Sequence, residues 1–157
     1  DDLEPVLIGK TAPNFAVFDT TLVNYARLYD MNTKPYKLLV FWSPDCGHCK
    51  KEIPVLDSLY PSYLKNDLDV FAVSTVADEG KGENIAMWKS FIRDHKLKFK
   101  NYADPKYQMS PLFKVLYKIK GTPEYFLLDK NNKIIAKKLA PEQILDFLSN
   151  YKKTVKN

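Results

Sequence analysis

The sequence contains few cysteines and histidines, and it has no long apolar run. Only two cysteines occur in 157 residues, whereas a disulfide-stapled scaffold needs several of them spread along the chain. A structural zinc site would need two ligands besides Cys46 and Cys49, and the only histidines are His48 and His95. No segment reaches the roughly 18 uninterrupted apolar residues of a membrane-spanning helix. With 45% hydrophobic and 27% charged residues, the composition is typical of a globular domain.

The charge balance does not point to nucleic acid. The 24 Lys and Arg residues exceed the 19 Asp and Glu residues, but they form no long basic block. The aromatic–glycine signature of RNA-binding domains is also missing. We therefore expect a solvated basic surface with at most a mild preference for acidic partners, and no nucleic-acid partner.

The chain is expected to form one domain after a short lead-in. Residues 1–13 include two prolines and a glycine and are interpreted as a lead-in segment or linker, which leaves residues 14–157 as the domain. The first residue is Asp1, and no positively charged and apolar leader follows it. We expect any signal or tether to lie upstream of this chain.

Strand and helix patterns alternate along the domain. Apolar runs at 37–42 and 68–74 predict two buried strands, each followed by apolar residues at helical spacing. Residues 124–129 and 134–136 predict a hairpin, and Pro141 opens a final helix. This order indicates an α/β fold in which a right-handed crossover joins the first two core strands in parallel.

Several segments carry weaker signals. Residues 14–18 and 99–103 predict short strands, residues 111–117 predict a short helix, and residues 22–31 fit either a strand or a short helix. In the helix after the cysteines, Pro54 predicts a kink and Pro61 a kink or a stop, because each proline removes a backbone donor.

Cys46 and Cys49 stand where the first core strand passes into its helix. Their spacing puts both side chains on one face of the first helical turn, so a disulfide can open and close without large backbone motion. The helix N-terminus favours the thiolate of Cys46, and His48 can add positive charge or a hydrogen bond. We expect Cys46 to attack and Cys49 to resolve the mixed disulfide. The redox-active pair then needs no further cofactor and no metal.

Glu52 follows Cys49 by three residues and shares its helical face. Its carboxylate can accept the Cys49 proton during resolution, directly or through a water molecule. The alternative is an acidic residue that the helix dipole favours near the helix start. The spacing alone leaves both interpretations open.

The segment from Phe41 to Pro54 resembles the active site of thioredoxin-like proteins, especially the TlpA/ResA-like envelope thiol–disulfide oxidoreductases. A second segment, from Gly121 to Asp129, resembles the loop of that superfamily whose proline is cis. The resemblance begins near Thr11 and extends to the last helix. It implies a thioredoxin fold with a central mixed β-sheet flanked by helices, an N-terminal extension and a central insertion within about residues 76–105.

The resemblance also implies a function. The chain is expected to be an enzyme, a thiol–disulfide oxidoreductase that works as a protein-disulfide reductase on substrates with disulfides or thiols. The expected place is the bacterial periplasm or cell envelope, with a membrane thiol protein as electron donor. Thr122 and Pro123 are expected to pack against the cysteines, with Thr122 pairing with an extended substrate. The other expected substrate contacts are Trp42, Pro44, Gly47 and His48.

Three departures from plain thioredoxin favour the envelope branch. Val40 stands where thioredoxins have a buried aspartate, and Glu52 matches a glutamate of the TlpA/ResA-like group. The stretch from Cys46 to Pro123 is also longer than in a plain thioredoxin, as the central insertion implies.

Two alternatives remain at this point. A peroxiredoxin-like peroxidase is favoured by Ser43, three residues before Cys46, but Leu39 stands where that family has proline. A non-catalytic metal-binding or chaperone module is the second, because Cys-x-x-Cys is half a zinc site.

Overall fold

A five-stranded mixed sheet forms the centre of the molecule. The computed structural model describes residues 6–75, 82–104 and 112–155. The sheet has the order β5-β4-β3-β6-β7. Strands β3, β4 and β5 run parallel to one another, β6 runs antiparallel to β3, and β7 runs antiparallel to β6. This confirms the expected mixed sheet and the parallel pairing of the two core strands. The strands are β3 (Tyr36–Trp42), β4 (Leu68–Ser74), β5 (Lys100–Tyr102), β6 (Glu124–Leu128) and β7 (Ile134–Lys137).

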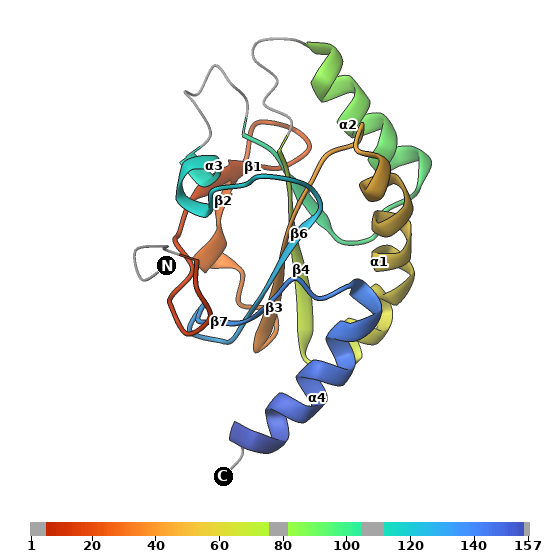
Figure 1. Ribbon diagram of the computed structural model, residues 1–157. Helices are drawn as coiled ribbons and strands as arrows, with labels where there is room; N and C mark the ends of the chain where they lie inside the picture. Colours follow the sequence, from red (N-terminus) through yellow and green to blue (C-terminus); the bar gives the residue numbers. More distant parts are fainter. Residues whose placement is uncertain (1–5, 76–81, 105–111, 156–157) are drawn as a thin grey trace.

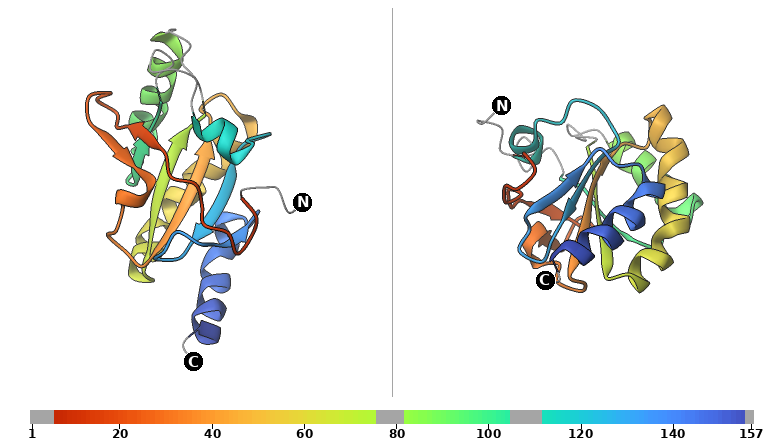
Figure 2. Two further views of the ribbon diagram at one scale, coloured as in Figure 1. Left: turned by 90° about the vertical axis from the view of Figure 1, so that its left-hand side faces the viewer. Right: turned by 60° about the horizontal axis from the view of Figure 1, so that its bottom comes forward.

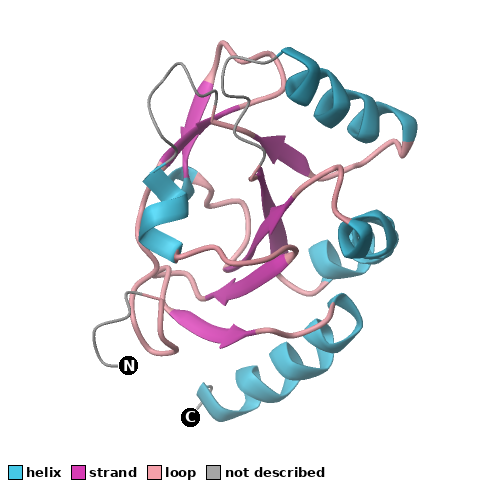
Figure 3. Cartoon of the chain, turned by 45° about the horizontal axis from the view of Figure 1, so that its top comes forward, coloured by secondary structure: helices cyan, strands magenta, loops and turns pink. Residues whose placement is uncertain are grey.

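Helices cover one face of the sheet and a mixed layer covers the other. Figure 1 and Figure 2 show α1, α2 and α4 on one side, and α3 with the two-stranded hairpin β1-β2 on the other. Figure 3 shows the strands of the five-stranded sheet between these two layers. The flanking elements are α1 (Gly47–Lys65), α2 (Gly82–Asp94), α3 (Leu112–Tyr117), α4 (Ile144–Val155), β1 (Ala16–Phe18), β2 (Tyr25–Arg27) and the 3-10 turns η1 (Leu28–Asp30) and η3 (Pro141–Gln143).

Strand β3 is apolar from Leu38 to Trp42, where both of its faces are buried. Val40 and Trp42 point toward the layer of α1, α2 and α4, whereas Leu39 and Phe41 point toward α3 and the hairpin. All four side chains are completely buried. Successive side chains thus point to opposite faces of the sheet, as strand geometry requires.

An aromatic cluster holds α3 against the sheet. The Phe41 ring lies 5.1 Å from the Tyr117 ring and 5.4 Å from the Phe113 ring, measured between centroids. Phe15 approaches Phe113 and Tyr117 at 5.6 Å each. These contacts fix the N-terminal segment and α3 on the face opposite α1.

Helix α1 runs without interruption through both of its prolines to Lys65. Of the two outcomes predicted at Pro61, a kink or a stop, the stop does not occur. A proline inside a helix costs about 3 kcal/mol, and packing of the helix outweighs this cost. Ile53 and Leu56 are completely buried, and the hydroxyl of the buried Tyr63 donates to the Pro141 carbonyl at 2.7 Å.

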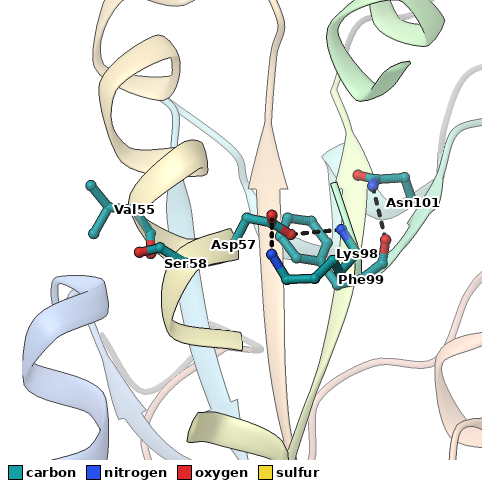
Figure 4. A network of polar contacts seen from close by, with 6 residues as sticks. All are labelled: Val55, Asp57, Ser58, Lys98, Phe99 and Asn101. Atoms are coloured by element: carbon teal, nitrogen blue, oxygen red, sulfur yellow. Dashed lines mark hydrogen bonds and ion pairs between the residues drawn. The ribbon is translucent and has the colours of Figure 1, made fainter. Parts of the chain in front are cut away.

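Asp57 adds a polar anchor on the same helix. The carboxylate is 6% exposed and accepts two hydrogen bonds of 2.7 Å, one from the backbone N–H of Lys98 and one from its Nζ. Figure 4 shows this clamp between α1 and the segment that leads into β5. These bonds join two residues that are 41 positions apart in the sequence.

The weaker predictions are resolved as follows. The ambiguous residues 22–31 contain both β2 and η1, and the turn before β7 uses Asn132 at a φ of 64°. Pro141 opens η3, which leads directly into α4.

Of the lead-in, residues 1–5 lie outside the described residues, and backbone hydrogen bonds join Gly9 and Lys10 to Ile134 of β7. The domain limits and the insertion within about 76–105 stay predictions. Across the described ranges, no helix combines the length and apolarity that crossing a membrane requires.

Candidate active site

Cys46 occupies the cap position at the start of α1, directly after β3. Its backbone is extended, and its Sγ accepts a 3.2 Å hydrogen bond from the N–H of Cys49. A side-chain acceptor at this position satisfies one of the N–H groups that the first helical turn leaves unpaired. The sulfur therefore lies at the positive end of the helix dipole.

Cys49 lies on the first turn of α1 and is completely buried. Its Sγ accepts a 3.5 Å hydrogen bond from the backbone N–H of Ser43. Both cysteines are free thiols. The accessible sulfur thus belongs to Cys46, which is half-buried, while Cys49 can be reached only from within the site.

The surroundings separate the pKa values of the two thiols. Partial burial acts to raise the pKa of Cys46, but hydrogen bonds from the Cys49 thiol and from the backbone of His48 and Cys49 outweigh it and lower the pKa. Burial raises the pKa of Cys49 to about 12, and the neighbouring Cys46 acts in the same direction. Cys46 therefore ionises first, and the proton stays on Cys49.

The loop before β6 reaches the first cysteine from the other half of the chain. The peptide bond between Thr122 and Pro123 is cis, as the resemblance implies. The Cys46 thiol donates to the Thr122 carbonyl oxygen at 3.2 Å across 76 residues of sequence. Both loop side chains are partly exposed. The fold thus brings the two predicted segments to one place.

Glu52 is half-buried on α1, and its partner was not anticipated from the sequence. The hydroxyl of Tyr125, in β6, donates to Glu52 Oε1 at 2.9 Å. Burial raises the pKa of Tyr125 first, and Glu52 and Cys49 raise it further, so the phenol stays a donor near Cys49. Tyr125 is 6% exposed, and nothing in the sequence near it indicates this contact.

The prediction that Trp42 contacts the substrate is wrong. Trp42 is completely buried, and its ring packs against Phe91 with centroids 5.1 Å apart. It therefore supports the site from beneath and has no surface with which to touch a substrate. Pro44 is also buried, whereas Gly47 and His48 are exposed beside the cysteines.

His95, the second histidine, takes no part in this site. It is exposed after the end of α2, stacks on Phe91 at 3.9 Å between ring centroids, and its Nδ1 lies 3.0 Å from the Phe91 carbonyl oxygen. In the part of the chain that the structure describes, no group of three or more His, Cys, Asp and Glu side chains could hold a metal ion.

A groove of about 530 Å³ adjoins the candidate site. Pro123, Glu52 and Tyr125 line it on the side of the cysteines. Its lining continues along the chain that leaves β7, at Lys137 and Lys138. The groove therefore begins at the residue next to Thr122, which contacts Cys46.

The arrangement agrees with comparisons to known proteins. A sequence profile of the AhpC/TSA family matches residues 8–137. The chain belongs to the AhpC/TSA family. Its relatives include the thiol-disulfide oxidoreductase ResA of Bacillus cereus, which is 33% identical over 150 residues that cover 96% of this chain and 79% of the relative.

Solved structures of similar proteins share the fold of this AhpC/TSA family member. A domain of a possible thiol-disulfide isomerase from Cytophaga hutchinsonii has a TM-score of 0.82 and 37% identity, with 97% of each chain covered. The thioredoxin domain of a thiol-disulfide oxidoreductase from Bacteroides vulgatus has a TM-score of 0.77 and 26% identity, covering 93% of this chain and 98% of that one. The predicted thioredoxin-like α/β fold and the resemblance to ResA-type thiol–disulfide oxidoreductases, with Cys46 and Cys49 as the Cys-x-x-Cys pair, are thereby confirmed.

Proposed function

We propose that this protein reduces disulfides in protein substrates through the Cys46–Cys49 pair. The observation that carries the proposal is the hydrogen bond from the Cys49 N–H to Cys46 Sγ at the start of α1, 3.2 Å long, together with the lowered pKa of that thiol. The names of the relatives, which describe thiol-disulfide oxidoreductases, support the same class of reaction.

The first step is attack by Cys46. Its thiolate bonds to one sulfur of a substrate disulfide, and the other sulfur leaves as a thiolate and takes up a proton. The backbone N–H of Cys49 and the helix start stabilise the attacking anion before the reaction. A mixed disulfide between Cys46 and the substrate is the product of this step.

The second step is resolution by Cys49. Its thiol must lose a proton, and the raised pKa of about 12 means that this proton needs an acceptor. Glu52 is our candidate, held by Tyr125 through the 2.9 Å hydrogen bond. The Cys49 thiolate then bonds to Cys46 Sγ, and the substrate leaves as a thiol. The protein ends oxidised by two electrons and the substrate reduced by two.

We assign substrate contact to the exposed rim of the site. Gly47 and His48 flank the accessible sulfur, and Thr122 and Pro123 face it from the opposite loop. The backbone of Thr122 is suited to pair with an extended substrate segment. The proposal extends to work in the bacterial periplasm or cell envelope and to re-reduction by a membrane thiol protein, which the resemblance to envelope reductases supports.

A redox titration combined with insulin reduction tests this function. We expect a reduction potential near the reducing end of the range of about −270 to −120 mV known for thioredoxin-fold pairs, and turnover of insulin disulfides. Cys46→Ser should abolish turnover, and Cys49→Ser should trap the mixed disulfide. A potential near the oxidising end without insulin reduction would instead indicate an oxidase or isomerase.

A peroxidase is a weaker second candidate. The hydroxyl of the buried Ser43, the residue that favoured it, donates to the Asp45 carboxylate. Peroxide consumption by the reduced protein, measured beside insulin reduction, distinguishes the two activities.

A further inference from the structure

The groove next to Pro123 carries an excess of positive charge. Four lysines line it, against the two carboxylates of Glu52 and Glu124. Both carboxylates already accept hydrogen bonds, Glu52 from Tyr125 at 2.9 Å and Glu124 from the backbone N–H of Lys120 at 3.4 Å. We call this surface the lysine groove and define it by Lys118, Lys120, Lys137 and Lys138.

The lysine groove also has an aromatic wall. Tyr117 and Phe126, both buried in the core, contribute to the lining. The Nζ of Lys137 lies 5.8 Å from the centroid of the Phe126 ring. An ammonium group over an aromatic face is held close to the apolar wall, where less water competes for a carboxylate.

The backbone at two of the lysines does not favour this residue type. Lys118 and Lys138 have φ values of 49° and 60°. Glycine and asparagine adopt this left-handed conformation more readily than lysine does. The local backbone conformation therefore does not require lysine at either place.

We propose that the lysine groove binds an acidic stretch of the protein substrate next to its reacting cysteine. The proposal rests on the function proposed above. A substrate sulfur joined to Cys46 lies beside Thr122, whose carbonyl oxygen is 3.2 Å from Cys46 Sγ. The next residue, Pro123, already lines the groove, so the chain that flanks the substrate cysteine enters at this point.

Carboxylates are the substrate groups that match this surface. Asp and Glu side chains pair with the ammonium groups. Complementary charge of this kind increases the rate of association more than the strength of binding. The preference should therefore be found in kcat/KM at low substrate concentration.

The experiment uses three short peptides that differ only in charge. Each contains one cysteine linked by a disulfide to 2-thiopyridine, followed by four acidic, neutral or basic residues. Reduced protein attacks the peptide sulfur through Cys46 and releases 2-thiopyridone, and Cys49 then releases the peptide thiol. At low salt we expect the acidic peptide to react about tenfold faster than the basic one. High salt should remove most of the difference.

Two triple variants with the same change in net charge separate the groove from the rest of the surface. Lys120, Lys137 and Lys138 are replaced by Gln in the test variant, and Lys65, Lys130 and Lys153 in the control. Lys65 ends α1, and Lys130 lies in the turn after β6, both at the far ends of the elements that begin at the site. Only the test variant should lose the preference, and Lys→Glu at the three groove positions should reverse it.

Each variant is also assayed with 2-hydroxyethyl disulfide, a small neutral substrate. Unchanged turnover of this disulfide shows that the site remains folded and reactive. Equal rates for the three peptides with the wild-type protein, or equal losses in both triple variants, would overturn the groove proposal alone. Failure of the wild-type protein to reduce the small disulfide would instead overturn the proposed function.

Discussion

The hydroxyl of Tyr125 donates a 2.9 Å hydrogen bond to the carboxylate of Glu52, and so joins β6 to α1 beneath the cysteine pair. Tyr125 pairs with Val40 across the β3–β6 ladder, where thioredoxins have a buried aspartate near that position on β3. A charged group near the buried cysteine is thus supplied by the helix and oriented by the neighbouring strand.

Removing this donor should slow resolution without slowing attack. In Tyr125→Phe, the half-buried Glu52 carboxylate loses a partner and a fixed orientation, so we expect a several-fold longer lifetime of the mixed disulfide. Stopped-flow measurement of both steps checks this, with Glu52→Gln as the comparison variant. If Glu52 accepts the proton, the double variant should be no slower than Glu52→Gln alone. Slowing of both steps equally would contradict the role of Tyr125.

The two thiols should titrate in a fixed order. Because the pKa of Cys46 is lowered and that of Cys49 is raised to about 12, alkylation by iodoacetamide should modify only Cys46 near neutral pH. The rate of alkylation should rise with pH, and the inflection of this curve should lie below the pKa of about 8.5 of free cysteine. Peptide mapping of the alkylated protein identifies the modified residue. Modification of Cys49 under these conditions, or an inflection at or above the free value, would be the contrary result.

Lys37 should make stability depend on pH in the alkaline range. It is 5% exposed, its Nζ bonds to the Leu28 carbonyl oxygen at 2.6 Å and to Asn132 Oδ1 at 2.9 Å, and burial lowers its pKa to about 8. Between pH 8 and about 10.4 the unfolded chain holds a proton that the native state has lost, so stability should rise with pH by up to about 3 kcal/mol. Below pH 8 this contribution is constant.

Denaturant unfolding at several pH values between 7 and 9.5 measures the Lys37 effect. Lys37→Met is the control, because it removes the titrating group and keeps the length of the side chain. Its difference from the wild-type protein should change with pH in the stated direction. A constant difference over this range would show that Lys37 does not titrate there.

The two hydrogen bonds that Asp57 accepts from Lys98 should contribute unequally to the free energy of unfolding. The Lys98 side chain is 51% exposed and that of Asp57 is 8% exposed. Lys98→Met keeps the backbone N–H bond and should cost at most about 1 kcal/mol of unfolding free energy. Asp57→Ala leaves that N–H without its partner and should cost about 1 to 3 kcal/mol. Chemical denaturation compares the two, and equal losses would mean that the exposed ion pair dominates.

The main strands could be predicted from sequence because a strand that is buried on both faces needs a run of mostly apolar residues. Strands β3 and β4 consist mainly of apolar residues, and the turn before β7 contains an asparagine that tolerates positive φ. The resemblance of the cysteine segment and the Gly-Thr-Pro segment to thioredoxin-like proteins likewise implied that these two parts of the chain would meet.

What the sequence could not supply depends on distant contacts. Tyr125 and Glu52 are 73 residues apart, and nothing near either residue indicates the other. Trp42 was misplaced because a tryptophan beside a reactive cysteine fits both a surface and a core position, and only the packing of Phe91 decides between them. Pro61 suggested a helix end locally, but the long-range contacts of α1 keep the helix intact.

Because Cys46 contacts Thr122, the state of the sulfur decides whether the Thr122 carbonyl oxygen is free to accept another hydrogen bond. The carbonyl oxygen of Thr122 is engaged by the S–H of the protonated thiol. A thiolate has no such proton, and neither has a sulfur in a disulfide. Ionisation or oxidation of Cys46 therefore frees this acceptor, so the state of the sulfur controls whether the Thr122 carbonyl oxygen can accept a hydrogen bond from another polypeptide.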